Sequence, residues 1–215
     1  MFKGTSASAG IGIGKAVIVE EAELVITRNE VADAEAEIQR FKGALEKTIA
    51  ATQKMADDLA SRVGEKEAEI MQGHMMLLSD PMLTGEIENS VKNDKVNCEF
   101  AIENVCNMYA DMFASMGDEL MQQRATDMRD IKVRMQRTLM GLESVDVSLL
   151  PKGSILVAKD LTPSMTAGIN PENVSGIVTE LGGKTSHSAI LARALEIPAV
   201  VAVNGLMDAV KDGDS

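Results

Sequence analysis

The sequence predicts an α/β domain that is interrupted by an inserted all-α helical bundle. Short apolar runs typical of strands occur near both ends of the chain, whereas the middle has apolar residues at helical spacing with charges between them. A lone N-terminal pair of strands would have nothing to cover it. We therefore assign residues 1–28 and 144–215 to the α/β domain and residues 29–143 to the bundle.

The N-terminal segment predicts two strands, at residues 16–19 and 24–26, because Val and Ile are concentrated there. From Val31 onward apolar residues recur at near-heptad spacing, which predicts a long amphipathic helix. Asn29 is a candidate N-cap of this helix, and Gly64 is a candidate stop.

Three further main helices complete the predicted bundle. They span residues 65–78, with an interruption at Gly73, then residues 98–116 after the candidate N-cap Asn97, and residues 119–139 before Gly141. A short helix is expected from Pro81. Short connections between the helices indicate an antiparallel bundle with a core of Leu, Ile and Met.

The C-terminal part alternates between strands and helices. Strands are expected at residues 154–158, 174–179 and 199–203, a short helix at Thr162-Pro163, and a second helix at residues 188–195 after a glycine loop. The final residues 210–215 form a turn of the kind that precedes a strand, so we expect the sequence to be part of a longer protein.

The composition excludes several classes of function. The 215 residues carry a net charge of -12 and include four Phe, one Tyr and no Trp, against 15 Met, so a nucleic-acid partner is not expected. No apolar run is long enough to span a membrane, and no secretory signal begins the chain, which predicts a cytoplasmic protein. Cys98 and Cys106 are expected to be reduced packing residues.

The candidate site is the run from Gly182 to Arg193. Two glycines allow the backbone to come close to a ligand, and Thr185 and Ser186 can cap the following helix, with His187 at its positive end. A histidine in this place can act as nucleophile, general base or metal ligand. The alternative is a turn with a partly buried capping histidine.

This run resembles the phosphohistidine signature of the phosphoenolpyruvate-utilising enzymes, G-G-x-T-S-H-x-A-I-x-A-R, and matches it at every fixed position. Together with the opening strands, the helical insert and the sequence Asp160-Leu161-Thr162-Pro163-Ser164, it resembles enzyme I of the phosphoenolpyruvate:sugar phosphotransferase system over nearly the whole chain. The resemblance implies an α/β phosphohistidine (swivelling) domain and an α-helical domain that binds the phosphocarrier HPr.

The resemblance also implies a phosphoryl relay at the head of sugar uptake. His187 would accept the group on Nε2 and exchange it with a histidine of HPr, and Thr166 would hydrogen-bond the other ring nitrogen. Phosphoenolpyruvate and Mg²⁺ would act in a carboxy-terminal part that this sequence lacks, so no metal is expected here and only phosphorylated HPr would serve as donor. We expect these residues to be monomeric and the intact protein to be a homodimer.

The loop Gly182, Gly183, Lys184, Thr185 and Ser186, with Arg193, is assigned to phosphoryl binding. For Lys184 the alternative is a solvated loop lysine. Arg193 lies about 120° around the helix from His187, so a structural ion pair is the alternative to a phosphate contact.

The stretch 65–78 resembles the HPr-facing part of the family. The partner-binding candidates there are Glu65, Glu67, His74, Met75, Met76 and Leu77. Three consecutive apolar residues cannot all face one core, so at least one of Met75, Met76 and Leu77 is expected on the surface, together with His74. Residues 31–145 carry 21 acidic and 13 basic side chains, which favours a basic partner surface.

Two other functions are consistent with the sequence. One is a nitrogen-regulatory paralogue of enzyme I, which usually carries an additional sensor domain in front. The other is a non-enzymatic module that binds a partner through its bundle and uses the histidine only structurally.

Overall fold

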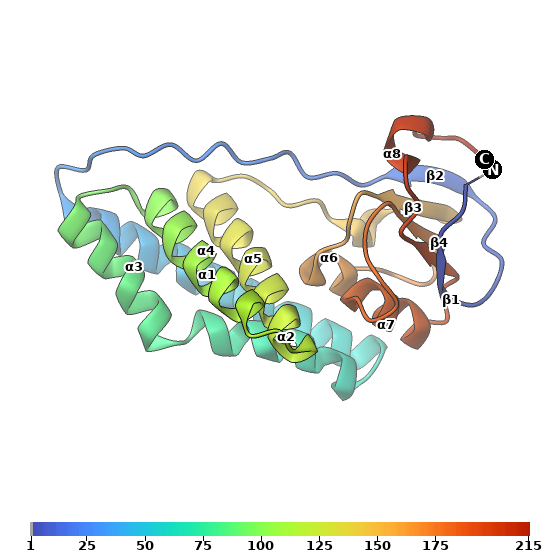
Figure 1. Ribbon diagram of the computed structural model, residues 1–215, viewed down its shortest axis with the longest axis horizontal. Coiled ribbons are helices and arrows are strands. Elements are labelled where there is room, and N and C mark those ends of the chain that lie inside the picture. Colours follow the sequence, from blue (N-terminus) through green and yellow to red (C-terminus); the bar gives the residue numbers. More distant parts are fainter. Residues whose placement is uncertain (1) are drawn as a thin grey trace. The chain divides into compact units, whose positions relative to one another are not determined.

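The computed structural model describes residues 2–215, and the chain divides into two compact units (Figure 1). The sheet unit comprises the residues up to Ala22, Leu59–Ala68 and Val145–Ser215. The helical unit comprises Glu23–Asp58 and Glu69–Ser144. The insert predicted at residues 29–143 therefore contributes one short stretch, Leu59–Ala68, to the sheet unit.

The sheet unit contains a five-stranded sheet in the order β1-β5-β4-β3-β2. Strand β1 pairs antiparallel with β5, and the other neighbours pair in parallel. The parallel part follows from the strand-helix-strand alternation of the C-terminal sequence. The strands are β1 Thr5–Ser8, β2 Lys15–Ile18, β3 Ser154–Ala158, β4 Val174–Thr179 and β5 Ala199–Val201.

The predicted strands at residues 154–158 and 174–179 are confirmed, whereas β1 was not expected. The strand predicted at residues 24–26 is wrong. Residues 24–26 pair with no strand in the described chain, and Val25 is 83% exposed, so its apolar side chain has no core to enter.

Both faces of the sheet are covered. On one face Leu156, Ile177 and Val201 are buried in a cluster that includes Ala189 of helix α7 (His187–Ala194). On the other face Val157 is buried with Leu206 of helix α8 (Leu206–Ala209). Apolar side chains therefore occupy both faces of the central strands, as expected for a parallel sheet. Helix α6 (Pro163–Ala167) and a 3₁₀ turn (Val147–Leu149) complete the unit.

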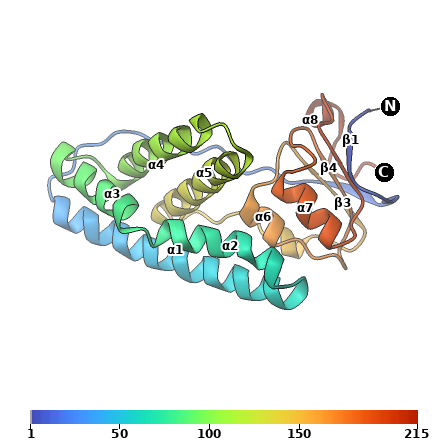
Figure 2. The same cartoon turned by 60° about the horizontal axis from the view of Figure 1, so that its bottom comes forward.

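The helical unit is built mainly from five helices (Figure 2). Gly73 does not interrupt the second helix, and the third helix is as long as the second instead of short. The first helix begins after Asp33, whose carboxylate accepts a hydrogen bond from the Ala36 N–H at 3.0 Å. The helices are α1 Ala34–Arg62, α2 Glu65–Leu78, α3 Pro81–Asp94, α4 Cys98–Ser115 and α5 Glu119–Met140.

The core of the helical unit is apolar, as predicted, with Ile87, Ile102, Met128 and Ile131 each at most 1% exposed. Cys98 and Cys106 are free, buried thiols, which confirms their packing role. Burial raises the pKa of Cys106 to about 12, so this thiol stays protonated and unreactive near neutral pH. No helix within residues 2–215 is long and apolar enough to cross a membrane.

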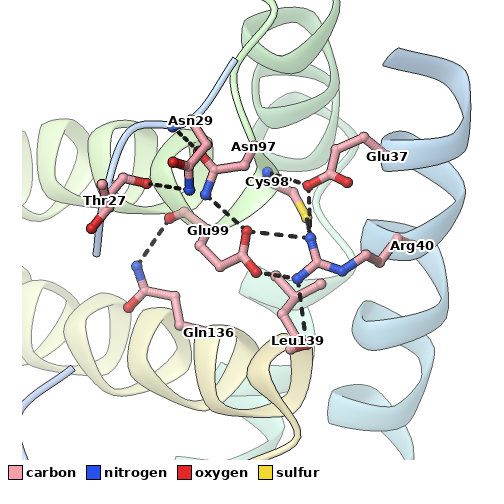
Figure 3. A network of polar contacts seen from close by, with 9 residues as sticks. All are labelled: Thr27, Asn29, Glu37, Arg40, Asn97, Cys98, Glu99, Gln136 and Leu139. Carbon is pink, nitrogen blue, oxygen red and sulfur yellow. Dashed lines mark hydrogen bonds and ion pairs between the residues drawn. The ribbon is translucent and has the colours of Figure 1, made fainter. Parts of the chain in front are cut away.

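A polar network around Arg40 joins three helices of the unit (Figure 3). The Arg40 guanidinium contacts Glu37 of α1 at 2.7 Å, Glu99 of α4, and the Leu139 carbonyl of α5 at 3.4 Å. Burial raises the pKa of Glu99, but hydrogen bonds, above all the one from Arg40, outweigh burial and lower that pKa overall. The network therefore holds Glu99 in its charged form.

The candidate caps Asn29 and Asn97 belong to the same network. Asn97 is the N-cap residue of α4, as predicted, although its side chain makes no capping hydrogen bond. Its Oδ1 accepts from the Asn29 N–H at 2.8 Å, and its Nδ2 donates to Glu99 at 3.0 Å. Asn29 does not cap α1, which begins after Asp33. An adjacent bridge pairs Glu30 with Val96. The asparagines thus attach the incoming chain to the start of α4.

Replacing Arg40 should destabilise the protein more than replacing a nearby exposed lysine. Arg40→Met leaves Glu37 and Glu99, only 14% and 13% exposed, without their cation, and should lower the free energy of unfolding by about 1–3 kcal/mol. Lys42→Met removes only the exposed pair with Glu88, with an expected change below about 0.5 kcal/mol. Urea unfolding followed by circular dichroism measures both, and equal effects would contradict the role of the network.

Candidate functional site

The candidate site lies at the carboxyl edge of the parallel strands. Helix α6 follows the end of β3 and helix α7 follows the end of β4, so the N-termini of both helices lie at this edge. The loops continue the pairing beyond the strands, since the Leu181 N–H donates to the Lys159 carbonyl at 2.8 Å. In parallel α/β sheets, this edge is where ligands bind.

The turn between β4 and α7 is fixed by glycine and hydroxyl groups. Gly182 has φ +98°, a left-handed conformation that glycine adopts without strain. Ser186 is the N-cap of α7: its hydroxyl accepts from the Ala189 N–H at 3.3 Å and donates to the Gly183 carbonyl at 2.8 Å. Ser188, which sequence reasoning overlooked, places its hydroxyl 2.9 Å from that of Ser186.

His187 is the first residue of α7 and is 9% exposed. The N-terminal end of a helix carries a partial positive charge and unpaired N–H groups, which favour a negative group on or beside the imidazole. Serine hydroxyls precede and follow the histidine, which fixes the backbone from which the ring extends. A nearly buried imidazole in this place suits attack on an anionic phosphorus centre better than a solvated one.

Thr166 lies on α6 and is 2% exposed. Its hydroxyl has one hydrogen, which is directed to the Pro163 carbonyl at 2.7 Å, with the Thr162 carbonyl at 3.2 Å. Toward any further group Thr166 can therefore only accept a hydrogen bond. An acceptor of this kind beside an imidazole would keep a proton on the ring nitrogen that faces it.

Asp160 adds an acidic group to the same edge. Its Oδ1 accepts a hydrogen bond from the Leu161 N–H at 2.8 Å. The same oxygen lies close to Gly182, since a Cβ atom at that glycine would be 3.8 Å from Oδ1. Although the residue is exposed overall, partial burial of the carboxylate raises the pKa of Asp160. Its charged form is therefore disfavoured in the loop that would receive an anion.

The two basic residues of the motif differ in their contacts. The side chain of Lys184 is exposed. The Arg193 guanidinium donates to the carbonyls of Ala7 and Lys184, each at 3.0 Å. The structural ion pair considered for Arg193 is therefore wrong for residues 2–215, because its two contacts there are with backbone carbonyls. The long side chain reaches back from the last turn of α7 to the loop before the helix.

His74, expected on a partner-facing surface, is fully buried in the helical unit. Its Nε2 lies 3.2 Å from Asp127 Oδ1, and its Nδ1 lies 3.7 Å from Asp130 Oδ2. These aspartates are three residues apart and so share one face of α5, where they offset the cost of burying the imidazole. The Asp-x-x-Asp spacing places both carboxylates on one helix face, but nothing near His74 in the sequence links it to them.

The other partner-binding candidates differ in exposure. Met76 is 71% exposed, whereas Met75 and Leu77 are half-buried, which confirms that at least one of the three reaches the surface. Glu65 is exposed and Glu67 is half-buried. Both glutamates belong to the stretch Leu59–Ala68 of the sheet unit.

Among residues 2–215 one group of side chains brings three possible metal ligands within 4.8 Å of one another: Glu37, Cys98 and Glu99. The Arg40 guanidinium already contacts all three residues. Burial, followed by the contacts of Glu37, raises the pKa of the Cys98 thiol, and Mg²⁺ prefers oxygen ligands in octahedral geometry. This group therefore does not fit Mg²⁺.

Comparison with known proteins agrees with this architecture. Two family models match the chain: "PEP-utilising enzyme, N-terminal" over residues 3–124 and "PEP-utilising enzyme, mobile domain" over residues 150–215. The second match contains the whole glycine-histidine run.

Curated relatives are similar over almost the whole chain. Phosphoenolpyruvate-protein phosphotransferase of Bacillus subtilis is 41% identical over 99% of this chain, and that of Listeria monocytogenes is 42% identical over 99%. The chain spans about 37% of the length of these relatives.

Two solved structures are also similar. A solution structure of Enzyme I has 40% identity and a TM-score of 0.84, covering 99% of this chain and 87% of that one. The N-terminal domain of Enzyme 1 - Nitrogen has 26% identity and a TM-score of 0.64, covering 94% of this chain and 83% of that one. The chain therefore belongs to the PEP-utilising enzymes and corresponds to the N-terminal region of an enzyme I of the phosphoenolpyruvate-dependent phosphotransferase type.

Proposed function

We propose that the chain relays a phosphoryl group through His187 to and from a histidine of the phosphocarrier HPr. The observation that carries the proposal is the position of His187 as first residue of a capped helix at the carboxyl edge of a parallel sheet. A phosphoryl group on this imidazole would lie where helix N–H groups and the helix dipole stabilise negative charge. Cytoplasmic location and a role in sugar uptake belong to the same proposal.

The transfer needs only one bond to form and one to break. The lone pair of His187 Nε2 attacks phosphorus in line, and the bond from phosphorus to the HPr imidazole breaks with its electron pair remaining on that nitrogen. The leaving imidazole is neutral when its other nitrogen carries a proton. Thr166, able only to accept, would keep the proton on Nδ1 of His187 and leave Nε2 free to attack.

In the forward direction of the relay, toward HPr, the donor to His187 would be phosphoenolpyruvate. Mg²⁺ would supply charge stabilisation for that step in a region found in the longer relatives. The candidate ligands of this chain do not fit Mg²⁺, and we assign them no step in the reaction.

The nitrogen-regulatory alternative is less well supported than the sugar-system enzyme. The solved nitrogen domain has a TM-score of 0.64 and 26% identity, against 0.84 and 40% for the Enzyme I structure. The second alternative, a non-enzymatic module, predicts that the chain binds HPr without accepting a phosphoryl group, and the following experiment tests this.

Phosphorylated HPr should label the 215-residue chain on one histidine-containing peptide, and His187→Ala should abolish the label. The matched control is His74→Gln, which alters the other histidine of the chain and should still accept the group once its fold is verified. The label is measured by phosphopeptide mapping without exposure to acid, which would hydrolyse the phosphohistidine. Labelling that persists in His187→Ala would contradict the assignment.

Phosphoenolpyruvate and Mg²⁺ without HPr should leave the chain unlabelled, because the donor site is assigned to another region. Efficient labelling under these conditions would show that the donor site lies within residues 1–215. Binding of HPr without any transfer in either direction would favour the non-enzymatic module.

Association with HPr should depend on Met76 and on salt. Met76→Ser removes an apolar side chain that is 71% exposed, and we expect about 5- to 10-fold weaker binding, whereas Met140→Ser on α5 should have little effect.

Raising the ionic strength should slow association because the acidic helical unit attracts a basic partner. Stopped-flow binding measures both, and a salt-independent rate constant would refute electrostatic steering.

A further inference from the structure

The guanidinium of Arg193 connects strand β1 to the loop that precedes His187. We propose that Arg193 is a positioning residue: it orients the Lys184–Thr185 peptide so that the Thr185 N–H is available to a phosphoryl group on His187. The inference rests on the proposed function and assigns to Arg193 a role through the backbone rather than a direct phosphate contact. The inference is based on a single nitrogen of Arg193, Nη1, which donates hydrogen bonds to two backbone carbonyls.

One of these carbonyls is available because β1 contains a bulge. Ser6 pairs with Val200 and Ser8 pairs with Ala199, so Ala7 is an extra residue in the antiparallel ladder. Ala7 is 6% exposed, and its carbonyl accepts from Arg193 Nη1 at 3.0 Å. A buried carbonyl outside the ladder needs a donor, and the guanidinium supplies it. The bulge therefore gives Arg193 a fixed anchor on the sheet.

The second carbonyl belongs to the loop itself. Arg193 Nη1 donates to the Lys184 carbonyl at 3.0 Å, and the preceding carbonyl, that of Gly183, accepts from the N–H of Ser186 at 3.1 Å. Two successive carbonyls of the loop thus have protein donors. Their orientation fixes the two peptide planes between Gly183 and Thr185.

The orientation of these planes determines where the loop amides point. In a trans peptide the N–H points opposite to the carbonyl, so holding the Lys184 carbonyl toward Arg193 turns the Thr185 N–H away from it. In the described part of the chain, neither the Lys184 N–H nor the Thr185 N–H donates to a protein acceptor. Two unpaired amides just before the capped helix suit phosphoryl oxygens, which backbone N–H groups commonly bind.

The test compares Arg193→Met and Arg193→Lys with the unaltered chain in transfer from phosphorylated HPr. Arg193→Met removes the guanidinium, and we expect the maximal transfer rate to fall about 10-fold or more, because small misplacements of reacting groups are costly. The half-saturating concentration of phosphorylated HPr should stay within about twofold, since Arg193 acts after docking. Arg193→Lys, which can donate to one carbonyl, should recover part of the rate.

The second readout is hydrogen exchange of the Ser186 amide, whose N–H donates to the Gly183 carbonyl at 3.1 Å, in the unphosphorylated chain. Exchange should accelerate about 10-fold or more in Arg193→Met and less in Arg193→Lys. Lys152→Met is the charge-matched control, because it removes one exposed cation of the sheet unit before β3 and should alter neither readout. If the Met variant unfolds, the Lys variant carries the test. We then expect a reduced transfer rate and faster amide exchange, with an unchanged half-saturating concentration of phosphorylated HPr.

Two results would overturn the inference. If Arg193→Met transfers at the normal rate while the unaltered chain is active, Arg193 does not position the loop and the proposed function stands. If the rate falls while loop exchange is unchanged, the charge acts directly on the phosphoryl group. Absence of transfer in the unaltered chain would instead refute the proposed function, and the inference with it.

Discussion

The hydrogen bonds of the turn Gly182–Ser186 determine where the imidazole of His187 lies, and the phosphoryl relay that we propose depends on that position. The turn begins where β4 ends, and the parallel pairing of β4 with β3 and β5 therefore sets its position. Gly182 reverses the chain at φ +98°, and Ser186 then caps α7. A helix N-terminus and a nearly buried histidine are thereby brought to the same edge of the sheet.

Polar side chains have different places in the two units. The two faces of the sheet are apolar and leave the carboxyl edge as the place where polar groups converge. In the helical unit polar groups instead connect helices: Arg40 joins three of them, and His74 lies between two aspartates of α5. The sheet unit places the His187 imidazole at its carboxyl edge, whereas the helical unit keeps the His74 imidazole and two thiols buried inside its fold.

Local signals in the sequence were sufficient for much of the fold and for the position of His187 at the start of a capped helix. Thr162-Pro163 predicted the short helix α6, and apolar runs predicted β3 and β4 at their observed bounds. The predicted helix at residues 188–195 is observed one residue earlier at both ends, with Ser186 as its cap. Capping and burial are local or periodic properties, which is why a single sequence contains them.

The errors arose where partners distant in sequence decide the structure. Asn29 was expected to cap α1, but its N–H bonds Asn97, 68 residues away. His74 was expected at the surface because no local feature indicates the aspartates more than 50 residues later. The contact between Arg193 and Ala7 spans 186 residues and depends on a bulge in a strand that the sequence did not reveal. Tertiary hydrogen bonds of this kind become visible only in the folded chain.

We propose that Nε2 of His187 carries the phosphoryl group while Nδ1 keeps its proton. The most direct measurement is ¹⁵N and ³¹P NMR of the chain with labelled histidine after phosphorylation by HPr, which is simplified because the chain has only two histidines. We expect phosphorus coupling to Nε2 of His187 and unchanged ring signals for His74. Coupling to Nδ1 of His187, or to His74, would contradict this proposal.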